Sequence, residues 1–264
     1  MPIWRSLVHI AATGQEVCNA MTQSQNDEPV VATKPPIINL PPVVWVLLGL
    51  LLTIHLVISQ GGDPWRAWTN YAFAFIPARF GTLPFPQPEG AAWWSMVTYA
   101  FLHADWEHVL ANSAWLAVFS KPVEARLGTL RYLALLTLSI IAGAVASLIA
   151  HWGETLIMVG ISAGVSGVLA AAIPLMNGKY VEHLDTVQPL RPLELLRNPR
   201  ALTFTVMWLF LTLVTATTQY MTGTAFLEQH VIAWEAHLGG FIAGFFAFYL
   251  LDATIERKSV HTLH

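Results

Sequence analysis

Long apolar runs, separated by short polar or Pro- and Gly-rich stretches, dominate the hydrophobic pattern of the chain. The first run, residues 43–59, lies between a Pro-Pro pair and a Gly-Gly pair, which is typical of the two ends of a helix. Five further runs follow, at residues 106–123, 130–150, 162–176, 201–221 and 234–251. Because about 20 apolar residues suffice for a helix to cross a bilayer, the pattern predicts an all-α polytopic membrane protein with a bundle of six transmembrane helices.

Three segments outside these runs complete the predicted organisation. Residues 1–41 are rich in Gln, Asn, Thr and Pro and are predicted to form a loose polar arm before the membrane domain of residues 42–252. Residues 61–104 are too aromatic for a solvated loop and too broken by Pro and Gly for a spanning helix. We predict that they form a structured interfacial first loop, with an ordinary connecting loop as the alternative. Residues 253–264 would be a short tail.

Composition supports a membrane protein and excludes several other classes. The chain is 55% hydrophobic and 11% charged, with a mean hydropathy of +0.54, whereas soluble domains carry about 25% charged residues. The single cysteine, Cys18, excludes an intramolecular disulfide and a cysteine-based metal site. A net charge of -3 without a basic run gives no support for nucleic-acid binding.

The distribution of Lys and Arg predicts the orientation in the membrane. If the N-terminus is cytosolic, eleven basic residues fall on the inner side, and only Arg66 and Arg79 fall outside. This positive-inside bias predicts that both termini are cytosolic.

With this topology the few polar residues of the apolar runs share one depth. His108 and Asn112 begin the second run, Ser162 begins the fourth and His237 begins the sixth, all on the outer side. A serine hydroxyl becomes a good nucleophile when a neutral imidazole accepts its proton, and Ser162 and His237 supply that pair. His108 and Asn112 are four residues apart and share one helix face, so they are candidates to stabilise an oxyanion. No acidic third member is apparent, which favours a dyad.

Small residues on two runs would let the serine and histidine helices approach closely. Gly160, Gly164 and Gly167 follow helical spacing around Ser162, and Gly240 and Gly244 follow His237. Each feature alone also has a structural interpretation: glycine faces pack helices, a serine often caps a helix, and a single histidine near a membrane interface is more often structural. The joint occurrence at one depth favours the functional interpretation.

Four motifs resemble those of the rhomboid intramembrane serine proteases. The stretch FLHADWEHVLANSAWLAVF is similar to the His-x-x-x-x-His-x-x-x-Asn helix of that family, and PVEARLG to its Glu-x-Arg element, with Glu124 and Arg126. VGISAGVSGVLAA resembles the serine motif and AHLGGFIAGFF the histidine helix. Together they cover most of residues 93–250 in the family's order, so the resemblance implies a rhomboid-like bundle.

The resemblance also implies roles for individual residues. Ser162 would be the nucleophile and His237 the base, His108 and Asn112 would stabilise the oxyanion, and His103 would support the junction of loop and helix beside the site. The segment of residues 61–104 would correspond to the family's first loop, in which this chain has Trp94-Ser95 where relatives often have Trp-Arg. No metal or organic cofactor would be used.

The serine motif has two registers. Literal Gly-x-Ser-Gly occurs at residues 164–167 and would make Ser166 the nucleophile, whereas the longer family pattern aligns without gaps on Ser162. The two serines are one helical turn apart, and Ser166 remains the alternative.

The resemblance implies transmembrane protein substrates in the lipid bilayer, cut near the outer face, and the compact six-run core favours a bacterial plasma membrane. A proteolytically inactive rhomboid-like protein that binds transmembrane helices is the main alternative, and retention of both Ser162 and His237 argues against it. A transporter would be expected to have more charged residues near mid-membrane. Movement of the fifth run or of residues 222–233, with Gly223 as a hinge, is a plausible gate.

Overall fold

The computed structural model describes residues 39–81, 86–182, 186–222 and 233–261. From Leu40 onward these residues belong to one compact unit, Leu40–His264. Nearly all of the predicted polar arm and most of the predicted gating loop, including Gly223, lie outside the described residues.

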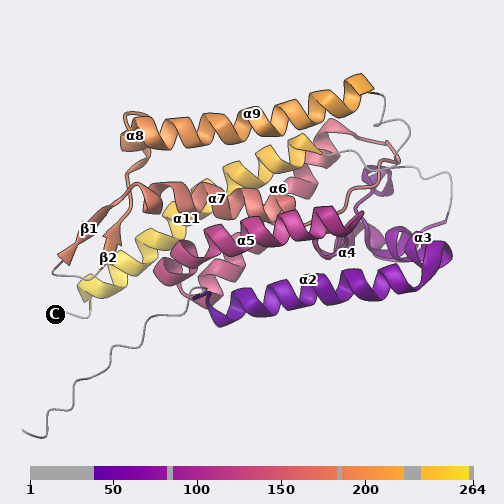
Figure 1. Ribbon diagram of the computed structural model, residues 1–264, viewed down its shortest axis with the longest axis horizontal. Coiled ribbons are helices and arrows are strands. Elements are labelled where there is room, and N and C mark those ends of the chain that lie inside the picture. The colour runs from indigo at the N-terminus through magenta and orange to yellow at the C-terminus, as the bar shows by residue number, and fades with distance from the viewer. Residues whose placement is uncertain (1–38, 82–85, 183–185, 223–232, 262–264) are drawn as a thin grey trace, which may run out of the picture. The chain divides into compact units, whose positions relative to one another are not determined.

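A long helix forms at each apolar run of the sequence (Figure 1). These helices are α2 (Pro42–Gln60), α5 (Trp106–Leu127), α6 (Thr129–Ala150), α7 (Ser162–Met176), α9 (Pro199–Thr222) and α11 (Trp234–His261). The connections contain shorter elements: α3 (Gly62–Phe73), η1 (Pro77–Phe80), α4 (Ala91–Thr98), η2 (Tyr99–Phe101) and α8 (Pro192–Leu195). A small antiparallel hairpin, β1 (Lys179–Val181) and β2 (Thr186–Gln188), follows α7 and pairs Tyr180 with Val187.

Three helices in the described part of the chain are long and apolar enough to cross a bilayer: Pro42–Gln60, Thr129–Ala150 and Trp234–Ala253. Two further apolar helices, Ser162–Met176 and Pro199–Val214, are shorter. The apolar helices make the chain an integral membrane protein. The count of six spans and the interfacial position of residues 61–104 remain predictions.

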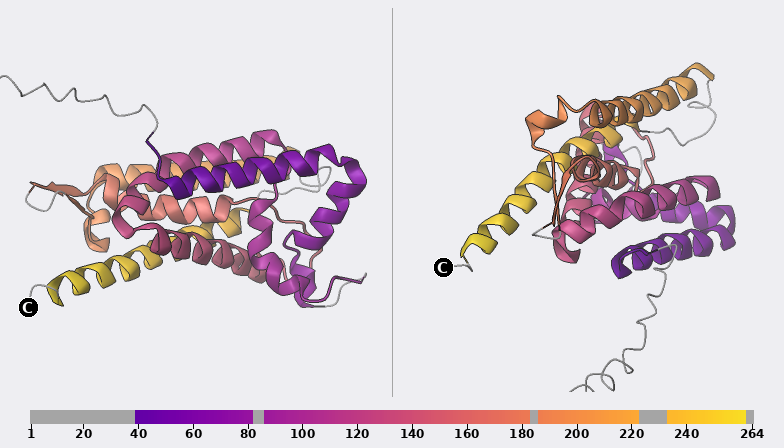
Figure 2. Two further views of the ribbon diagram at one scale, coloured as in Figure 1. Left: turned by 90° about the horizontal axis from the view of Figure 1, so that it is seen from below. Right: turned by 60° about the vertical axis from the view of Figure 1, so that its left-hand side comes forward.

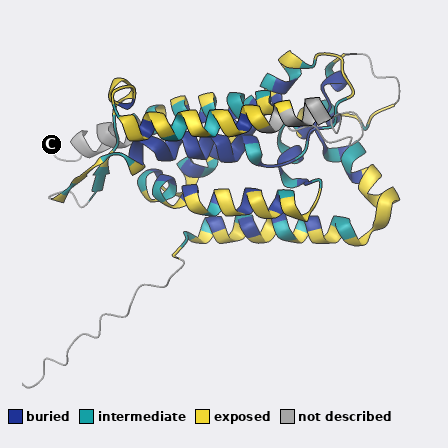
Figure 3. Ribbon diagram, turned by 45° about the horizontal axis from the view of Figure 1, so that its top comes forward, coloured by how far each residue is buried: buried dark blue, intermediate teal, exposed yellow. Residues whose placement is uncertain are grey.

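Helix α7 is the centre of the packing. It contacts α5, α6, α9 and α11, and α2 packs on the other side of α5 (Figures 1 and 2). Every residue from Ala163 to Leu175 is buried, and the buried residues gather in the middle of the bundle (Figure 3). The small side chains of this helix permit such contact on all sides.

The segment between α2 and α5 is folded around a buried arginine. The guanidinium of Arg79 donates from Nη1 to the carbonyl oxygens of Ala74 (2.9 Å) and Ala91 (3.4 Å), and from Nη2 to the carbonyl oxygen of Tyr71. Ser95 is fully buried and its hydroxyl donates to the carbonyl oxygen of Ala92. Arg79 therefore ties the end of α3 to the start of α4.

The Glu-x-Arg element lies at the far end of α5 from His108. Arg126 makes a two-point ion pair with Asp252 of α11, with Nε to Oδ1 at 2.6 Å and Nη2 to Oδ2 at 3.1 Å. Glu124 instead accepts a hydrogen bond from the hydroxyl of Thr129 at the start of α6 (2.7 Å). The ion pair joins two helices that are 126 residues apart in sequence.

Candidate active site

The structure brings the predicted serine and histidine together. Ser162, the first residue of α7, has its Oγ 2.8 Å from Nε2 of His237 in the first turn of α11. This is a normal hydrogen-bond length, and both residues are only partly buried. An imidazole that accepts this hydrogen bond at Nε2 carries its proton on Nδ1, and is then ready to take the hydroxyl proton of Ser162.

Glycines allow the two helices to approach this closely. A Cβ added to Gly240 would overlap the carbonyl oxygen of Ala163, and one added to Gly244 would overlap the backbone of Gly167. On the other side of α11, a Cβ added to Gly239 would lie 2.8 Å from the carbonyl oxygen of Ala142 in α6. The small residues of α7 and α11 thus meet backbone to backbone, one and two turns beyond the dyad.

Residues 151–161, the strap, connect α6 to α7. Backbone hydrogen bonds hold the strap against the segment between α2 and α5. Phe75 and Met158 exchange two bonds of 3.0 and 2.9 Å, and Ala78 N–H donates to the carbonyl of Glu154 (2.9 Å). Gly160 N–H donates to the carbonyl of Tyr99 (3.0 Å). These bonds fix the strap immediately before Ser162.

His108 and Asn112 converge on the end of the strap. Asp105 caps α5 by accepting from the backbone N–H of His108 (2.7 Å), so the helix starts at Trp106 and presents both side chains from its first two turns. Gly160 has a φ of +109°, a conformation that favours glycine. A Cβ there would lie 2.8 Å from Nε2 of His108 and 3.5 Å from Nδ2 of Asn112, so both side chains face the backbone two residues before Ser162.

Donors for an anion are present at this point. Nδ2 of Asn112 is buried and has no hydrogen-bond partner among the described residues. The backbone N–H of Val165 bonds to the carbonyl of Ile161 at the start of α7, and the N–H groups of a first helical turn have no intrahelical partner. A negatively charged oxygen beside Ser162 would therefore find side-chain and backbone donors within the same small volume.

His103 lies next to this group in a buried position. Its ring meets that of His108 with centroids 5.0 Å apart at 75°. Burial, reinforced by the charges of His108 and His55, lowers the pKa of His103 to about 3, so its imidazole is neutral at physiological pH. His55, from α2, packs its ring edge-on against Trp106 at 4.7 Å, which connects α2 to the start of α5.

The alternative serine, Ser166, bonds to the helix backbone. Ser166 is 3% exposed, and its hydroxyl donates to the backbone carbonyl of Ser162 at 2.8 Å. Gly164 packs against Leu136 and Ile140 of α6. Of the two serines in the motif, only Ser162 has a hydrogen bond to His237 in the described part of the chain.

Two polar groups beside the site were not among the residues predicted from sequence. Arg79 holds the first loop, and His151 bonds both Glu154 and Glu235. Apart from Glu154, which is three residues from His151, their partners depend on loop conformation or on a distant helix end, so no motif spacing reveals them. For Arg79 the one available signal was a basic residue within an apolar segment broken by Pro and Gly.

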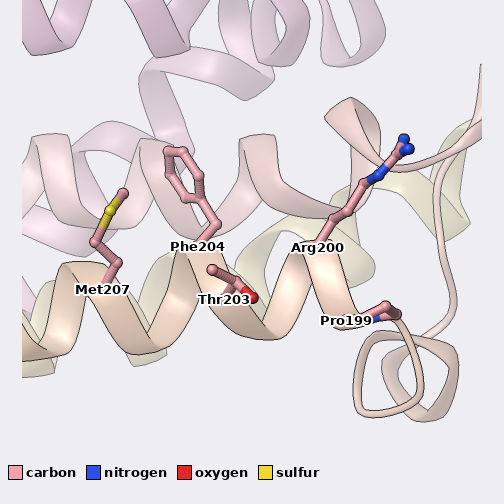
Figure 4. A pocket seen from close by; sticks show the side chains of 5 residues that line it. All are labelled: Pro199, Arg200, Thr203, Phe204 and Met207. Carbon is pink, nitrogen blue, oxygen red and sulfur yellow. The ribbon is translucent and has the colours of Figure 1, made fainter.

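The described residues also bear on metal binding and on ligand pockets. They contain no group of three His, Cys, Asp or Glu side chains arranged to hold a metal ion. A shallow pocket lies on α9, lined by Pro199, Arg200, Thr203, Phe204 and Met207 (Figure 4). All five of its residues belong to one helix, and none is a predicted site residue.

Comparison with known proteins identifies the family. The family described as the rhomboid domain matches residues 90–253. The rhomboid protease GlpG of Yersinia pestis (strain Pestoides F) is 28% identical over 207 residues, which cover 77% of this chain and 60% of the relative. The protein of the same name from Yersinia enterocolitica is 29% identical over 207 residues, with the same coverage.

The chain therefore spans about three fifths of the length of these relatives. The family match includes the helices that carry His108, Asn112, Ser162 and His237. The resemblance seen in the sequence motifs is thus confirmed, and the chain belongs to the rhomboid family.

Proposed function

We propose that this protein is an intramembrane serine endopeptidase that cleaves transmembrane segments of membrane proteins near the outer face by a Ser162–His237 dyad. The observation that carries the proposal is the 2.8 Å hydrogen bond between Ser162 Oγ and His237 Nε2, with His108 and Asn112 facing the backbone beside it. The names of the relatives, rhomboid protease, support the same activity.

In the first step, Ser162 Oγ attacks the carbonyl carbon of the scissile peptide while its proton moves to Nε2 of His237. The carbonyl π bond opens, and the electron pair settles on the oxygen. In this proposal Asn112 Nδ2, the His108 ring and the N–H groups of the first turn of α7 stabilise this oxyanion. Where single donors of this kind have been measured, each lowers the barrier by roughly 3 to 4 kcal/mol.

In the second step, the imidazolium of His237 gives its proton to the leaving amine nitrogen as the carbon–nitrogen bond breaks. An acyl ester on Ser162 remains. Water then attacks the ester carbon while one of its protons moves to His237. The bond between this carbon and Ser162 Oγ breaks, the carboxylic acid leaves, and His237 returns the proton to Oγ, which regenerates the hydroxyl. The dyad therefore needs local water, and the substrate helix must unwind to expose its carbonyl group, because a helix in lipid keeps that group in internal hydrogen bonds.

A movement of α9 is our proposal for substrate entry. Its described contacts with neighbouring helices include two aromatic pairs, Trp208 stacked on Phe241 at 4.6 Å and Phe204 edge-on to Phe119 at 5.9 Å. Apolar contacts of this kind can slide or separate without leaving a buried polar group unpaired. Cleavage that persists after α9 is cross-linked to α5 would contradict the gate.

The decisive experiment is labelling with a fluorophosphonate probe, followed by peptide mapping. We expect the parent to be labelled on Ser162, the Ser166→Ala variant to be labelled as the parent is, and Ser162→Ala to be unlabelled. His237→Ala should react slower by about 10²-fold or more because the base is missing. Labelling on Ser166 would move the nucleophile. A folded parent that is never labelled would favour the alternative, an inactive rhomboid-like protein that binds transmembrane helices.

We further propose that the protein lies in a bacterial inner membrane with both termini in the cytosol, as the distribution of basic residues suggests. The single cysteine offers a direct test, because Cys18 precedes the first apolar run. A membrane-impermeant maleimide should leave Cys18 unlabelled in intact spheroplasts and label it after permeabilisation. Labelling in intact spheroplasts would reverse the topology.

A further inference from the structure

A polar cluster near the dyad takes no part in the mechanism above. His151 lies at the end of α6, where its Nδ1 is 2.9 Å from Oε2 of Glu154 and its Nε2 is 3.2 Å from Oε1 of Glu235. The Glu154 side chain is 59% exposed, whereas those of His151 and Glu235 are 24% and 16% exposed. The imidazole thus has one partner in solvent and one partly buried partner on another helix.

The link between His151 and Glu235 joins the two chain segments that carry the dyad. His151 is the first residue of the strap that leads to Ser162, and Glu235 lies two residues before His237 in the first turn of α11. The partners are 84 residues apart in sequence. Backbone bonds fasten the rest of the strap to Phe75, Ala78 and Tyr99, while the His151 side chain fastens its beginning to α11.

Glu235 does not orient the His237 ring directly. Two residues on a helix are separated by about 200° around the axis, so the two side chains leave α11 on different faces. Glu235 instead acts on the backbone of the first turn, which is the part of a helix most prone to fraying. Its second oxygen, Oε2, is buried without a hydrogen-bond partner in the described residues, so the bond to His151 is the main described compensation for burying this carboxylate.

We propose that His151 is a positioning residue: through its hydrogen bond to Glu235 it holds the first turn of α11 against the strap and thereby sets His237 Nε2 at bonding distance from Ser162 Oγ. This inference rests on the proposed function. A displacement of reacting groups by about 1 Å lowers rates by about 10²-fold, so loss of the link should reduce the reactivity of Ser162 by about ten- to a hundredfold without removing a reacting group.

The experiment compares variants of the full chain in nanodiscs. His151→Ala and Glu235→Ala remove the link, Glu235→Gln keeps an acceptor oxygen at the same place, and Glu154→Ala removes the other partner of His151 without touching α11. The first measurement is the second-order rate of fluorophosphonate labelling, together with kcat and KM on a transmembrane substrate. The second is hydrogen exchange of the backbone amides at residues 234–240, which does not depend on activity.

We expect both link-breaking variants to label about ten- to a hundredfold slower, with lower kcat, unchanged KM and faster exchange at residues 234–240. Glu235→Gln should recover most of the rate, Glu154→Ala should resemble the parent, and the double variant His151→Ala/Glu235→Ala should be no slower than either single one, because both remove the same interaction.

Two results would overturn the inference. Unchanged exchange in Glu235→Ala would mean that the link does not hold α11, and faster exchange with a parental labelling rate would mean that it holds α11 without positioning the dyad. A parent that is never labelled refutes the proposed function and with it the positioning role. The exchange measurement then still reports whether the link between His151 and Glu235 restrains α11.

Discussion

Replacing Gly240 by alanine should force the two helices of the dyad apart. The added Cβ would overlap the carbonyl oxygen of Ala163 and would lie 2.7 Å from its carbonyl carbon, against 3.4 Å, where ordinary contact begins. The obstacle is backbone and has no rotamer to adopt. Relief of the contact with the carbonyl carbon alone needs about 0.7 Å, and the carbonyl oxygen is closer still, so α11 must move away from α7 by more than about 0.7 Å. Overpacking of this size costs about 1–3 kcal/mol of folding free energy.

The same movement would stretch the dyad. Gly240 lies three residues after His237, and the hydrogen bond from His237 to Ser162 is 2.8 Å long. A separation of more than about 0.7 Å along this bond would bring it beyond about 3.5 Å, outside the usual range of such bonds. We therefore expect Gly240→Ala to label with a fluorophosphonate about ten- to a hundredfold slower than the parent.

Two other glycines provide matched controls. Gly49, inside α2, has nothing within 4 Å of the position that a Cβ would take, so Gly49→Ala should be neutral or slightly stabilising. Gly239→Ala meets Ala142 and Ala146 of α6, so it should lose stability as Gly240→Ala does but retain more labelling. Unfolding in detergent and the labelling rate are measured for all three. A folded Gly240→Ala protein that labels at the parental rate would refute the reasoning.

Three further changes test other parts of the structure. Asp252→Ala removes the carboxylate that makes the two-point ion pair with Arg126, whose side chain is 15% exposed, and should lower the free energy of unfolding by about 1.5–3 kcal/mol. A loss no larger than that of Glu124→Ala would contradict this. Arg79→Met removes the donor that bonds the carbonyls of Tyr71, Ala74 and Ala91, at a cost of about 1–3 kcal/mol for each group left unsatisfied. The backbone amides of residues 62–101 should then exchange faster with solvent. Exchange at the parental rate would exclude an anchoring role for Arg79. The pKa of His103 is lowered from 6.5 to about 3. The contribution of its neutral imidazole to the free energy of unfolding is therefore complete above pH 6.5 and is lost as the pH falls toward 3, by at most about 1.4 kcal/mol per pH unit. His103→Asn should reduce this loss of stability in acid, and an unchanged dependence on pH would assign the loss to other groups.

The helices were predictable because apolar blocks and their flanking residues are local signals. The predicted run at residues 162–176 matches α7, but α5 and α11 extend to Leu127 and His261, beyond the predicted ends at 123 and 251. In α5 the helix continues past Pro122 to Leu127 and is capped by Gly128, whose φ of 75° suits glycine. Hydrophobicity marks the apolar part of a helix, whereas capping geometry decides where it stops.

The pairing of Ser162 with His237 was predictable from polar residues at one depth and from the small residues beside them. Helical spacing alone does not separate Ser162 from Ser166, because residues one turn apart share a helix face; the longer family pattern is what favours Ser162. The hydrogen bond from Ser166 to the Ser162 carbonyl depends on the side-chain rotamer of Ser166, which residue spacing does not predict. Arg79 and the His151–Glu235 link depend on loop conformations and on contacts between distant segments, which no periodicity encodes.

The unequal lengths of α6 and α7 give a physical reason for a polar site in this apolar bundle. Helix α6 has 22 residues and α7 has 15, so α7 is shorter by about 10 Å at a rise of about 1.5 Å per residue. The strap connects the end of α6 to Ser162, so irregular chain takes the place of the missing helical turns. Its backbone bonds to Phe75, Ala78 and Tyr99 hold it there. Irregular backbone at membrane depth is tolerated where it is buried in protein or lines a water-filled cavity. A short central helix therefore provides what the proposed chemistry needs: a serine at a helix start, N–H donors without intrahelical partners beside it, and longer helices packed around it.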